Sequence, residues 1–231
     1  MGLDIIPLPR AKAGHEAEFR EIFLKLRAPD TDKRAGLWGK LKGRVPSERE
    51  GQVLTQRFQE ISEPHYLTIE APEVGRDAAA DEWVREAFAE GRLSGIQSVE
   101  DALAQLSGYR VLEIMPESDG FPVYSNGDAY EGVDRASFRG SFLTECENFL
   151  PEVLLNSAWK PMLAEELSAW GDAVAEEARK FAETEGVVQV LGKRDIEEDL
   201  ETPARSAHIA DSAARWALFW SARAHGSDAY F

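Results

Sequence analysis

The sequence contains one cysteine, Cys146, in 231 residues, so no disulfide can form within the chain. Scarce cysteine is typical of a reducing compartment. Long apolar stretches are also missing: no run approaches the roughly 20 residues that span a bilayer. Pro7 and Pro9 interrupt the apolar residues near the start of the chain, which argues against a secretory signal. These absences predict a soluble, cytoplasmic protein that does not enter a membrane.

Several motifs of catalysis and nucleotide binding are absent as well. Gly39-Lys40 is followed by Leu41, so the G-x-x-x-x-G-K-[ST] phosphate loop is incomplete. The G-x-S-x-G nucleophile elbow, the G-x-G-x-x-G dinucleotide fingerprint and C-x-x-C do not occur. Histidine appears only four times, without an H-E-x-x-H pair. We therefore predict no catalytic residue, metal or cofactor, and favour a protein that is not an enzyme.

Basic residues are outnumbered: 26 Lys and Arg face 42 Asp and Glu, which gives a formal net charge of −16. A field of this sign repels polyanions, so broad nucleic-acid binding is not expected, whereas a basic protein partner is favoured. The charge is uneven along the chain. Residues 33–57 hold seven basic and two acidic residues, and residues 195–201 hold five acidic residues in seven.

Apolar residues recur at helical spacing through most of the chain. The pattern predicts helices over about 14–26, from 47, over 77–91, after 98, after 134, over about 159–185 and over 202–226. The last of these is apolar nearly all round between Trp216 and Trp220. Such a helix is either buried at the centre of a domain, which we favour, or covered by a second copy in a homodimer.

Three segments favour β-strands. Residues 65–71 and 109–115 are rich in β-branched and aromatic side chains, and Asn126-Gly127 predicts the turn of a hairpin over 121–131. A weaker pattern favours a short strand at 187–193. Because the three main segments lie between runs of helix, we expect an α+β fold: a helix-rich single domain over 1–231 with a small, mainly antiparallel sheet.

The segment 28–46 is longer than ordinary loops and has an unusual composition. It carries Trp38, Lys40, Lys42 and Arg44 together with three glycines. Glycine lets backbone approach a ligand, the cations attract phosphate or carboxylate, and the indole offers a stacking face. These four residues are candidate ligand-binding residues. The alternative is that the cations are solvated and the tryptophan packs into the core.

The predicted hairpin turn supplies a second candidate pair, Asn126 and Asp128. Aspartate beside such a turn commonly bonds nearby backbone, so turn chemistry is favoured over catalysis. A calcium loop is excluded because the register that centres Gly127 places Pro122, which has no side-chain oxygen, at the first ligand position.

Two further groups have a functional and a structural interpretation. His208 and Asp211 lie three residues apart on the predicted last helix and could face one metal, although exposure on a polar helix face is favoured. Cys146 lies on an apolar stripe between Phe142 and Phe149 and has glutamates beside it, which favours core packing over a reactive thiolate.

Three functions stay open on this basis. The favoured one is a binding or regulatory protein that acts through a protein or ligand contact, because charge is segregated and catalytic motifs are absent. The first alternative is an enzyme acting on a small anionic substrate, with the 28–46 segment as a lid over carboxylates such as Asp128. The second is an acidic inhibitor that imitates a polyanion, which requires a contiguous acidic patch.

Overall fold

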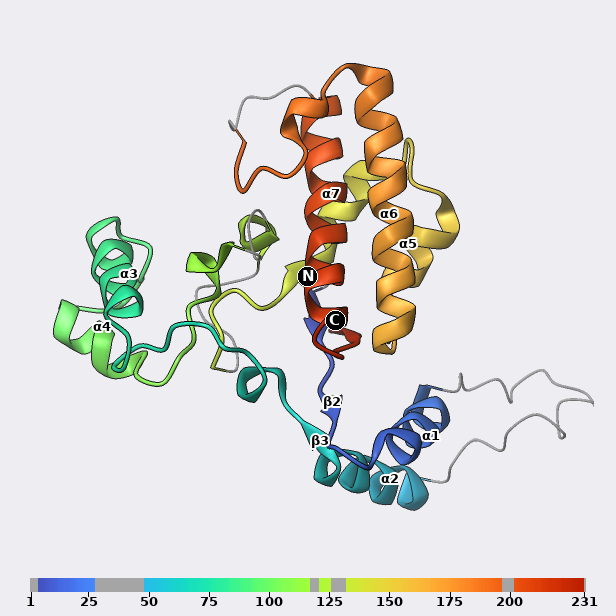
Figure 1. Ribbon diagram of the computed structural model, residues 1–231, viewed down its shortest axis with the longest axis horizontal. Helices are drawn as coiled ribbons and strands as arrows, with labels where there is room; N and C mark the ends of the chain where they lie inside the picture. Colours follow the sequence, from blue (N-terminus) through green and yellow to red (C-terminus); the bar gives the residue numbers. More distant parts are fainter. Residues whose placement is uncertain (1–3, 28–47, 117–120, 126–131, 197–201, 231) are drawn as a thin grey trace, which may run out of the picture. The chain divides into compact units, whose positions relative to one another are not determined.

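The structure, a computed structural model, describes residues 4–27, 48–116, 121–125, 132–196 and 202–230 (Figure 1). The chain forms two compact units. The larger consists of Met1–Leu8 together with His65–Phe231, and the smaller is Pro9–Pro64. A single-domain organisation over 1–231 stays a prediction.

A small antiparallel sheet crosses the larger unit, and helices make up most of the remaining regular structure. The strands are β1 (Asp4–Pro7), β4 (Phe138–Arg139) and β5 (Ser227–Tyr230), in the order β4-β1-β5. Ile5 pairs with Phe138 on one side and with Ala229 on the other. The helix-rich α+β class is therefore confirmed. Its sheet joins the beginning, the middle and the end of the chain.

The predicted strand at 65–71 is wrong. The segment begins with a 3-10 helix, His65–Leu67, and its closing residue explains why. The backbone nitrogen and the hydroxyl of Thr68 both donate to the His65 carbonyl oxygen, at 3.1 and 2.9 Å. A threonine that bonds backward in this way stabilises a turn instead of an extended strand.

The predicted strand at 109–115 is also wrong. Arg110 makes only isolated bridges, to Glu73 and to Val133, and a 3-10 helix follows at Leu112–Ile114. Val111 and Leu112 are fully buried, so the apolar run reflects core packing and not a strand ladder.

The remaining strand predictions also need correction. In the predicted hairpin, Phe121–Tyr124 is a 3-10 helix, and its turn at 126–131 lies outside the described residues. Val188–Val190, within the weaker strand prediction, is a 3-10 helix too. The helix predicted after residue 134 is instead β4 followed by a 3-10 helix at Gly140–Cys146. Short apolar runs do not distinguish these local conformations, because each can bury the same side chains.

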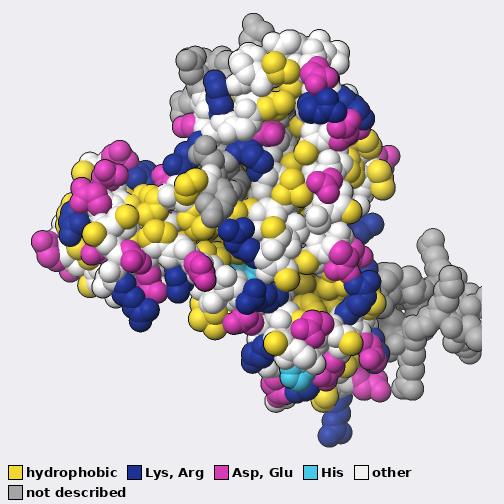
Figure 2. Space-filling model, in the orientation of Figure 1, with side chains coloured by type: hydrophobic (Ala, Val, Ile, Leu, Met, Phe, Trp, Pro, Cys, Tyr) yellow, Lys and Arg dark blue, Asp and Glu magenta, His cyan; other side chains and the backbone are white. Residues whose placement is uncertain are grey.

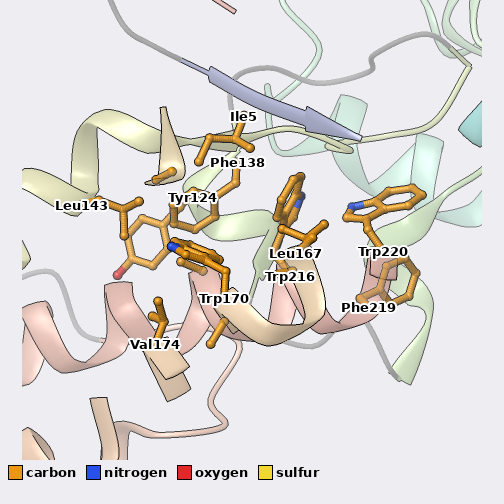
Figure 3. Packing of buried hydrophobic residues seen from close by; sticks show 14 of the residues in the cluster. Ile5, Tyr124, Phe138, Leu143, Leu167, Trp170, Val174, Trp216, Phe219 and Trp220 are labelled. Carbon is orange, nitrogen blue, oxygen red and sulfur yellow. The ribbon is translucent and has the colours of Figure 1, made fainter. Parts of the chain in front are cut away.

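The main core lies between α6 (Ala164–Glu185) and α7 (Thr202–Ser221), which run side by side (Figure 1). Leu167 and Trp170 of α6 pack in the same cluster as Trp216 and Trp220 of α7 (Figure 3). The Trp216 indole donates to the Ala136 carbonyl at 2.8 Å, which satisfies its buried N–H. The central burial of α7 is thus confirmed, and a homodimer stays a prediction.

Gly171 allows the two helices to approach closely. A Cβ at this position would lie 3.1 Å from the Cβ of Ala217 and 3.3 Å from the carbonyl oxygen of Ala214. Small residues on both helices therefore set the distance between α6 and α7.

A second cluster forms around α3 (Ala78–Ala89) and α4 (Val99–Gln105). The buried face of α3 is the one that its periodicity predicts: Ala80, Trp83, Val84 and Ala87. The Trp83 indole donates to Glu113 at 3.1 Å, so this cluster also satisfies its buried N–H.

The smaller unit is a helical hairpin on a two-stranded base. Strands β2 (Arg10–Ala11) and β3 (Ser62–Glu63) pair antiparallel, and α1 (Glu16–Arg27) contacts α2 (Glu48–Glu60). Phe19 stacks on Phe58 with a ring-centroid distance of 4.4 Å. Among the described helices of both units, none has the length and apolarity needed to cross a membrane.

Candidate functional site

The ligand-binding residues predicted from the sequence lie outside the described residues. They occupy the segments 28–47 and 126–131 and are Trp38, Lys40, Lys42, Arg44, Asn126 and Asp128. Their roles therefore stay predictions.

A pocket of about 400 Å³ lies beside helix α5 (Glu152–Ala158) in the larger unit. This volume falls within the range of small-molecule sites. Its lining consists of Thr144, Glu147, Leu150, Glu152, Leu155, Asn156 and Trp159. We call these seven residues the acidic pocket.

The turn between the 3-10 helix and α5 explains why two glutamates meet at this pocket. The amide of Leu150 donates to the Cys146 carbonyl at 2.9 Å, and Pro151 is the N-cap residue of α5. Leu150 is only 4% exposed, so the turn is fixed to the core. Glu147 and Glu152, on either side of this anchor, remain exposed at the rim.

Trp159 forms an aromatic wall of the pocket, and a glycine holds it in place. A Cβ at Gly140 would lie only 2.7 Å from Cζ3 of the Trp159 indole and 3.3 Å from Cγ1 of Ile5. The ring therefore rests directly against the backbone of the 3-10 helix. This support restricts the indole before any ligand arrives.

Two side-chain donors of the polar rim are already used within the protein. The Thr144 hydroxyl donates to the Ser141 carbonyl at 2.8 Å, and the Asn156 amide nitrogen is 3.3 Å from Oε1 of Glu152 and donates to it. Both side chains keep an oxygen that can accept a further hydrogen bond. Among the described residues that line the pocket, none is Lys, Arg or His. This lining is thus rich in acceptors and carries two carboxylates without a basic residue beside them in the lining.

This arrangement suits binding of a cation that carries carbon atoms. Carboxylates attract the charge, while Leu150, Leu155 and Trp159 provide apolar and aromatic surface for the rest of the ligand. Covalent catalysis would need a nucleophile with an adjacent base, and the lining residues do not supply that pair. The acidic pocket therefore has the chemistry of a binding site.

A second pocket, of about 580 Å³, lies at the N-terminal end of α3. Its lining mixes Glu70, Asp77 and Arg110 with small apolar residues. The Arg110 guanidinium donates to the Ala71 carbonyl at 3.0 Å and lies 3.4 Å from Glu73. Because its cation is already engaged, this pocket offers less unbalanced charge than the acidic pocket.

The predicted exposure of His208 is wrong, because the side chain is fully buried. Its Nε2 lies 2.9 Å from the Lys193 carbonyl and its Nδ1 lies 2.8 Å from the Tyr124 hydroxyl. A carbonyl only accepts, so Nε2 donates to Lys193 and the tyrosine donates to Nδ1. Burial lowers the pKa of His208 and raises the pKa of Tyr124, which favours the neutral pair.

Asp211 does not complete a metal site with this histidine. Its Oδ2 accepts from Arg215 at 2.8 Å and from the Gly192 amide at 2.9 Å. Over the described part of the chain, no group of three or more His, Cys, Asp or Glu side chains could hold a metal ion.

Cys146 is a core residue, as its position on the apolar stripe predicts. Its thiol is buried and donates to the Ser206 carbonyl at 3.4 Å. Burial, with a smaller contribution from the charge of Glu145, raises the pKa of the thiol to about 12. The thiolate that a reactive cysteine needs is therefore suppressed.

Charged side chains alternate in sign on the face shown in Figure 2, where Asp and Glu lie among Lys and Arg. Helix α6 illustrates this alternation, since Arg179 pairs with Glu176 and Glu183 at 2.5 and 3.0 Å. Over its described residues, this face does not form the contiguous acidic patch that imitation of a polyanion requires.

Sequence reasoning missed the acidic pocket because residues from 134 to about 149 were predicted to form a helix and no element was predicted for residues 150–158. A signal was present: residues 141–159 contain three glutamates and one tryptophan but no Lys, Arg or His. Comparison with protein-family models, curated proteins and solved structures gives no match. Function is therefore inferred from the residues of this chain.

Proposed function

We propose that this protein is a binding protein whose acidic pocket accepts a cationic organic group from a protein partner or a small ligand. The carrying observation is that Glu147 and Glu152 flank a pocket whose described lining contains no basic side chain. A bound cation would supply the missing opposite charge. We place this role in the cytoplasm, which the single cysteine supports.

The formal net charge of −16 also favours this role. A negative protein raises the encounter rate with cations over long range, and the local carboxylates then hold them. Because the rim glutamates are exposed, solvent weakens each ion pair. We expect a single cationic group to bind with a dissociation constant of roughly 10 μM to 1 mM, about −4 to −7 kcal/mol.

The two alternatives have less support. An enzyme acting on a small anionic substrate would need a site that attracts anions, whereas the acidic pocket repels them. An acidic inhibitor would need clustered carboxylates, whereas those on the face in Figure 2 alternate with cations. Both therefore stay hypotheses.

Titration of the protein with matched four-carbon probes tests the proposal. Butylammonium and butylguanidinium carry a cation, butyramide is neutral and butyrate is an anion. In two-dimensional NMR, the cationic probes should shift the amides of Thr144 and Asn156 and the indole N–H of Trp159. Butyramide and butyrate should leave these signals in place.

A double variant, Glu147→Gln with Glu152→Gln, should weaken binding of the cations about tenfold or more, since two charge-assisted contacts are lost. The matched control is Glu86→Gln with Glu185→Gln. Both control residues are exposed outside the pocket, and the change in net charge is identical. Equal weakening by the two double variants, or binding of butyrate at the same signals, would contradict the proposal.

A further inference from the structure

The geometry points to a guanidinium group, presented by an arginine side chain of a protein partner, as the occupant of the acidic pocket. This inference rests on the proposed function and narrows it to one kind of cation. Three features support it: the excess of hydrogen-bond acceptors on the rim, the planar arrangement of the N–H donors of a guanidinium, and the fixed indole of Trp159.

The rim of the acidic pocket presents hydrogen-bond acceptors. Thr144 has given its hydroxyl proton to Ser141, and the amide of Asn156 is turned toward Glu152. The described lining therefore offers the lone pairs of two carboxylates, one hydroxyl oxygen and one amide oxygen, and these acceptors outnumber its remaining side-chain donors. A guanidinium has five N–H donors and no acceptor, so it brings no lone pair of its own to this rim.

The acceptors come from two chain segments on either side of Pro151. Thr144 and Glu147 precede the proline, and Glu152 and Asn156 follow it on α5. A guanidinium directs its donors outward in one plane and can serve both segments at once. The ammonium of lysine is a compact, strongly hydrated charge. Removing its water to bring it next to Leu150 and Leu155 therefore costs more free energy than it does for a guanidinium.

Trp159 adds a preference for a planar cation. Its indole is held against the backbone at Gly140, so little side-chain freedom is lost when a ligand stacks on it. Guanidinium groups stack on indole more often than ammonium groups do. The three methylenes of arginine can lie along Leu150 and Leu155 while the guanidinium reaches the carboxylates of Glu147 and Glu152.

A set of acetylated and amidated pentapeptides, Gly-Gly-X-Gly-Gly with a fluorescent label, tests this choice. X is arginine, lysine or citrulline, the neutral isostere of arginine. By fluorescence polarisation, we expect the arginine peptide to bind about fivefold tighter than the lysine peptide, since only arginine combines stacking with the donor fork. It should bind about tenfold or more tighter than the citrulline peptide, which has lost the charge.

Variants of Thr144, an exposed residue, separate acceptor chemistry from folding. Thr144→Val keeps the shape and removes the oxygen, so the arginine peptide should bind about threefold more weakly. Thr144→Ser keeps the oxygen and should retain binding. Far-UV circular dichroism and urea unfolding of each variant confirm that the fold is intact.

The outcomes are distinguishable. Lysine binding as tightly as arginine, or Thr144→Val binding the arginine peptide like Thr144→Ser, would overturn the inference and leave the proposed function standing. Failure of the arginine and lysine peptides and of both cationic probes would remove the proposed function as well. Tighter binding of arginine that is lost in the Glu147→Gln, Glu152→Gln variant and kept in the Glu86→Gln, Glu185→Gln control would support both.

Discussion

His225 Nδ1 lies 2.8 Å from the carbonyl oxygen of Leu8, and the Nε2 of the same ring lies 2.5 Å from the Thr68 hydroxyl. Leu8 is the last residue before the chain leaves the larger unit, and the chain returns at His65, three residues before Thr68. One buried imidazole therefore bonds both points where the larger unit is interrupted. Because a carbonyl only accepts, Nδ1 carries a proton and donates to Leu8.

Replacing this imidazole should destabilise the larger unit. His225→Ala removes the bonds to Leu8 and Thr68 and leaves buried polar groups without these partners, at a cost of about 3 kcal/mol. Urea unfolding followed by circular dichroism measures the change. His15→Ala, at a partly exposed histidine of the smaller unit, is the control and should change stability by less than about 0.5 kcal/mol. Similar values for the two variants would contradict the role of His225.

Adding one methyl group at Gly140 should disturb the acidic pocket. In Gly140→Ala, the new Cβ would lie 2.7 Å from the Trp159 ring, so the indole must move. We expect a loss of about 1–3 kcal/mol in unfolding free energy and weaker binding of butylguanidinium. Thermal unfolding and the NMR signal of the Trp159 indole N–H report the two effects.

Gly51→Ala is the matched control for this prediction. Gly51 lies within α2, and a Cβ there would meet nothing within 4 Å. Alanine is the better helix former, so stability should stay the same or rise by up to about 1 kcal/mol. An unchanged indole signal in Gly140→Ala would show that the glycine does not hold the ring.

His65 should make stability depend on pH. Burial, and to a smaller extent the charge of His225, lowers the pKa of His65 from 6.5 to about 4. Between these values the unfolded chain binds a proton that the folded protein does not, so stability falls as pH decreases from about 6.5 to 4. The stability that the neutral state of His65 provides is fully present near pH 7 and is lost below pH 4. The difference in unfolding free energy is about 3 kcal/mol.

Two measurements check this prediction. The ring protons of His65 should titrate by NMR with a midpoint near 4. In His65→Gln, the unfolding free energy should change less between pH 7 and 4.5 than in the unaltered protein. A His65 midpoint near 6.5, or an unaltered pH dependence in the variant, would contradict the prediction.

The hydroxyl of Tyr124 should stabilise the main core through His208. Tyr124→Phe removes the donor to Nδ1, which is buried, and should cost about 1–3 kcal/mol. Tyr66→Phe is the control because Tyr66 is exposed, and it should change stability by less than about 0.5 kcal/mol. Urea unfolding of the two variants tests the difference. Equal effects would show that the Tyr124–His208 bond does not contribute.

Much of the helical structure could be predicted because helices depend on residues close in sequence. The periodicity of Trp83, Val84 and Ala87 identifies the buried face of α3, and Ser98 caps α4 by accepting from the Asp101 amide at 3.1 Å. Gly186 ends α6 with φ of 71°, as a left-handed cap requires. Spacing, caps and stops of this kind act within a few residues, so the sequence displays them directly.

Only the tertiary structure decided the sheet and the candidate site. β1 and β5 pair residues from opposite ends of the chain, and no local pattern distinguishes that pairing from a loop. His208 has a polar neighbour three residues away in sequence, yet its environment is set by Tyr124, 84 residues distant.

The acidic pocket depends on both levels. The sequence of residues 141–159 contains its glutamates and lacks basic residues, but the apolar stripe from Phe138 to Phe149 suggested a helix over the first part of this segment. Burial of Leu150 in the core and the close approach of Trp159 to Gly140 instead accompany a turn beside which the pocket lies. The sequence thus determined most of the long helices and the charge of this protein. Packing between distant residues determined where that charge gathers, because burial free energy depends on the whole fold.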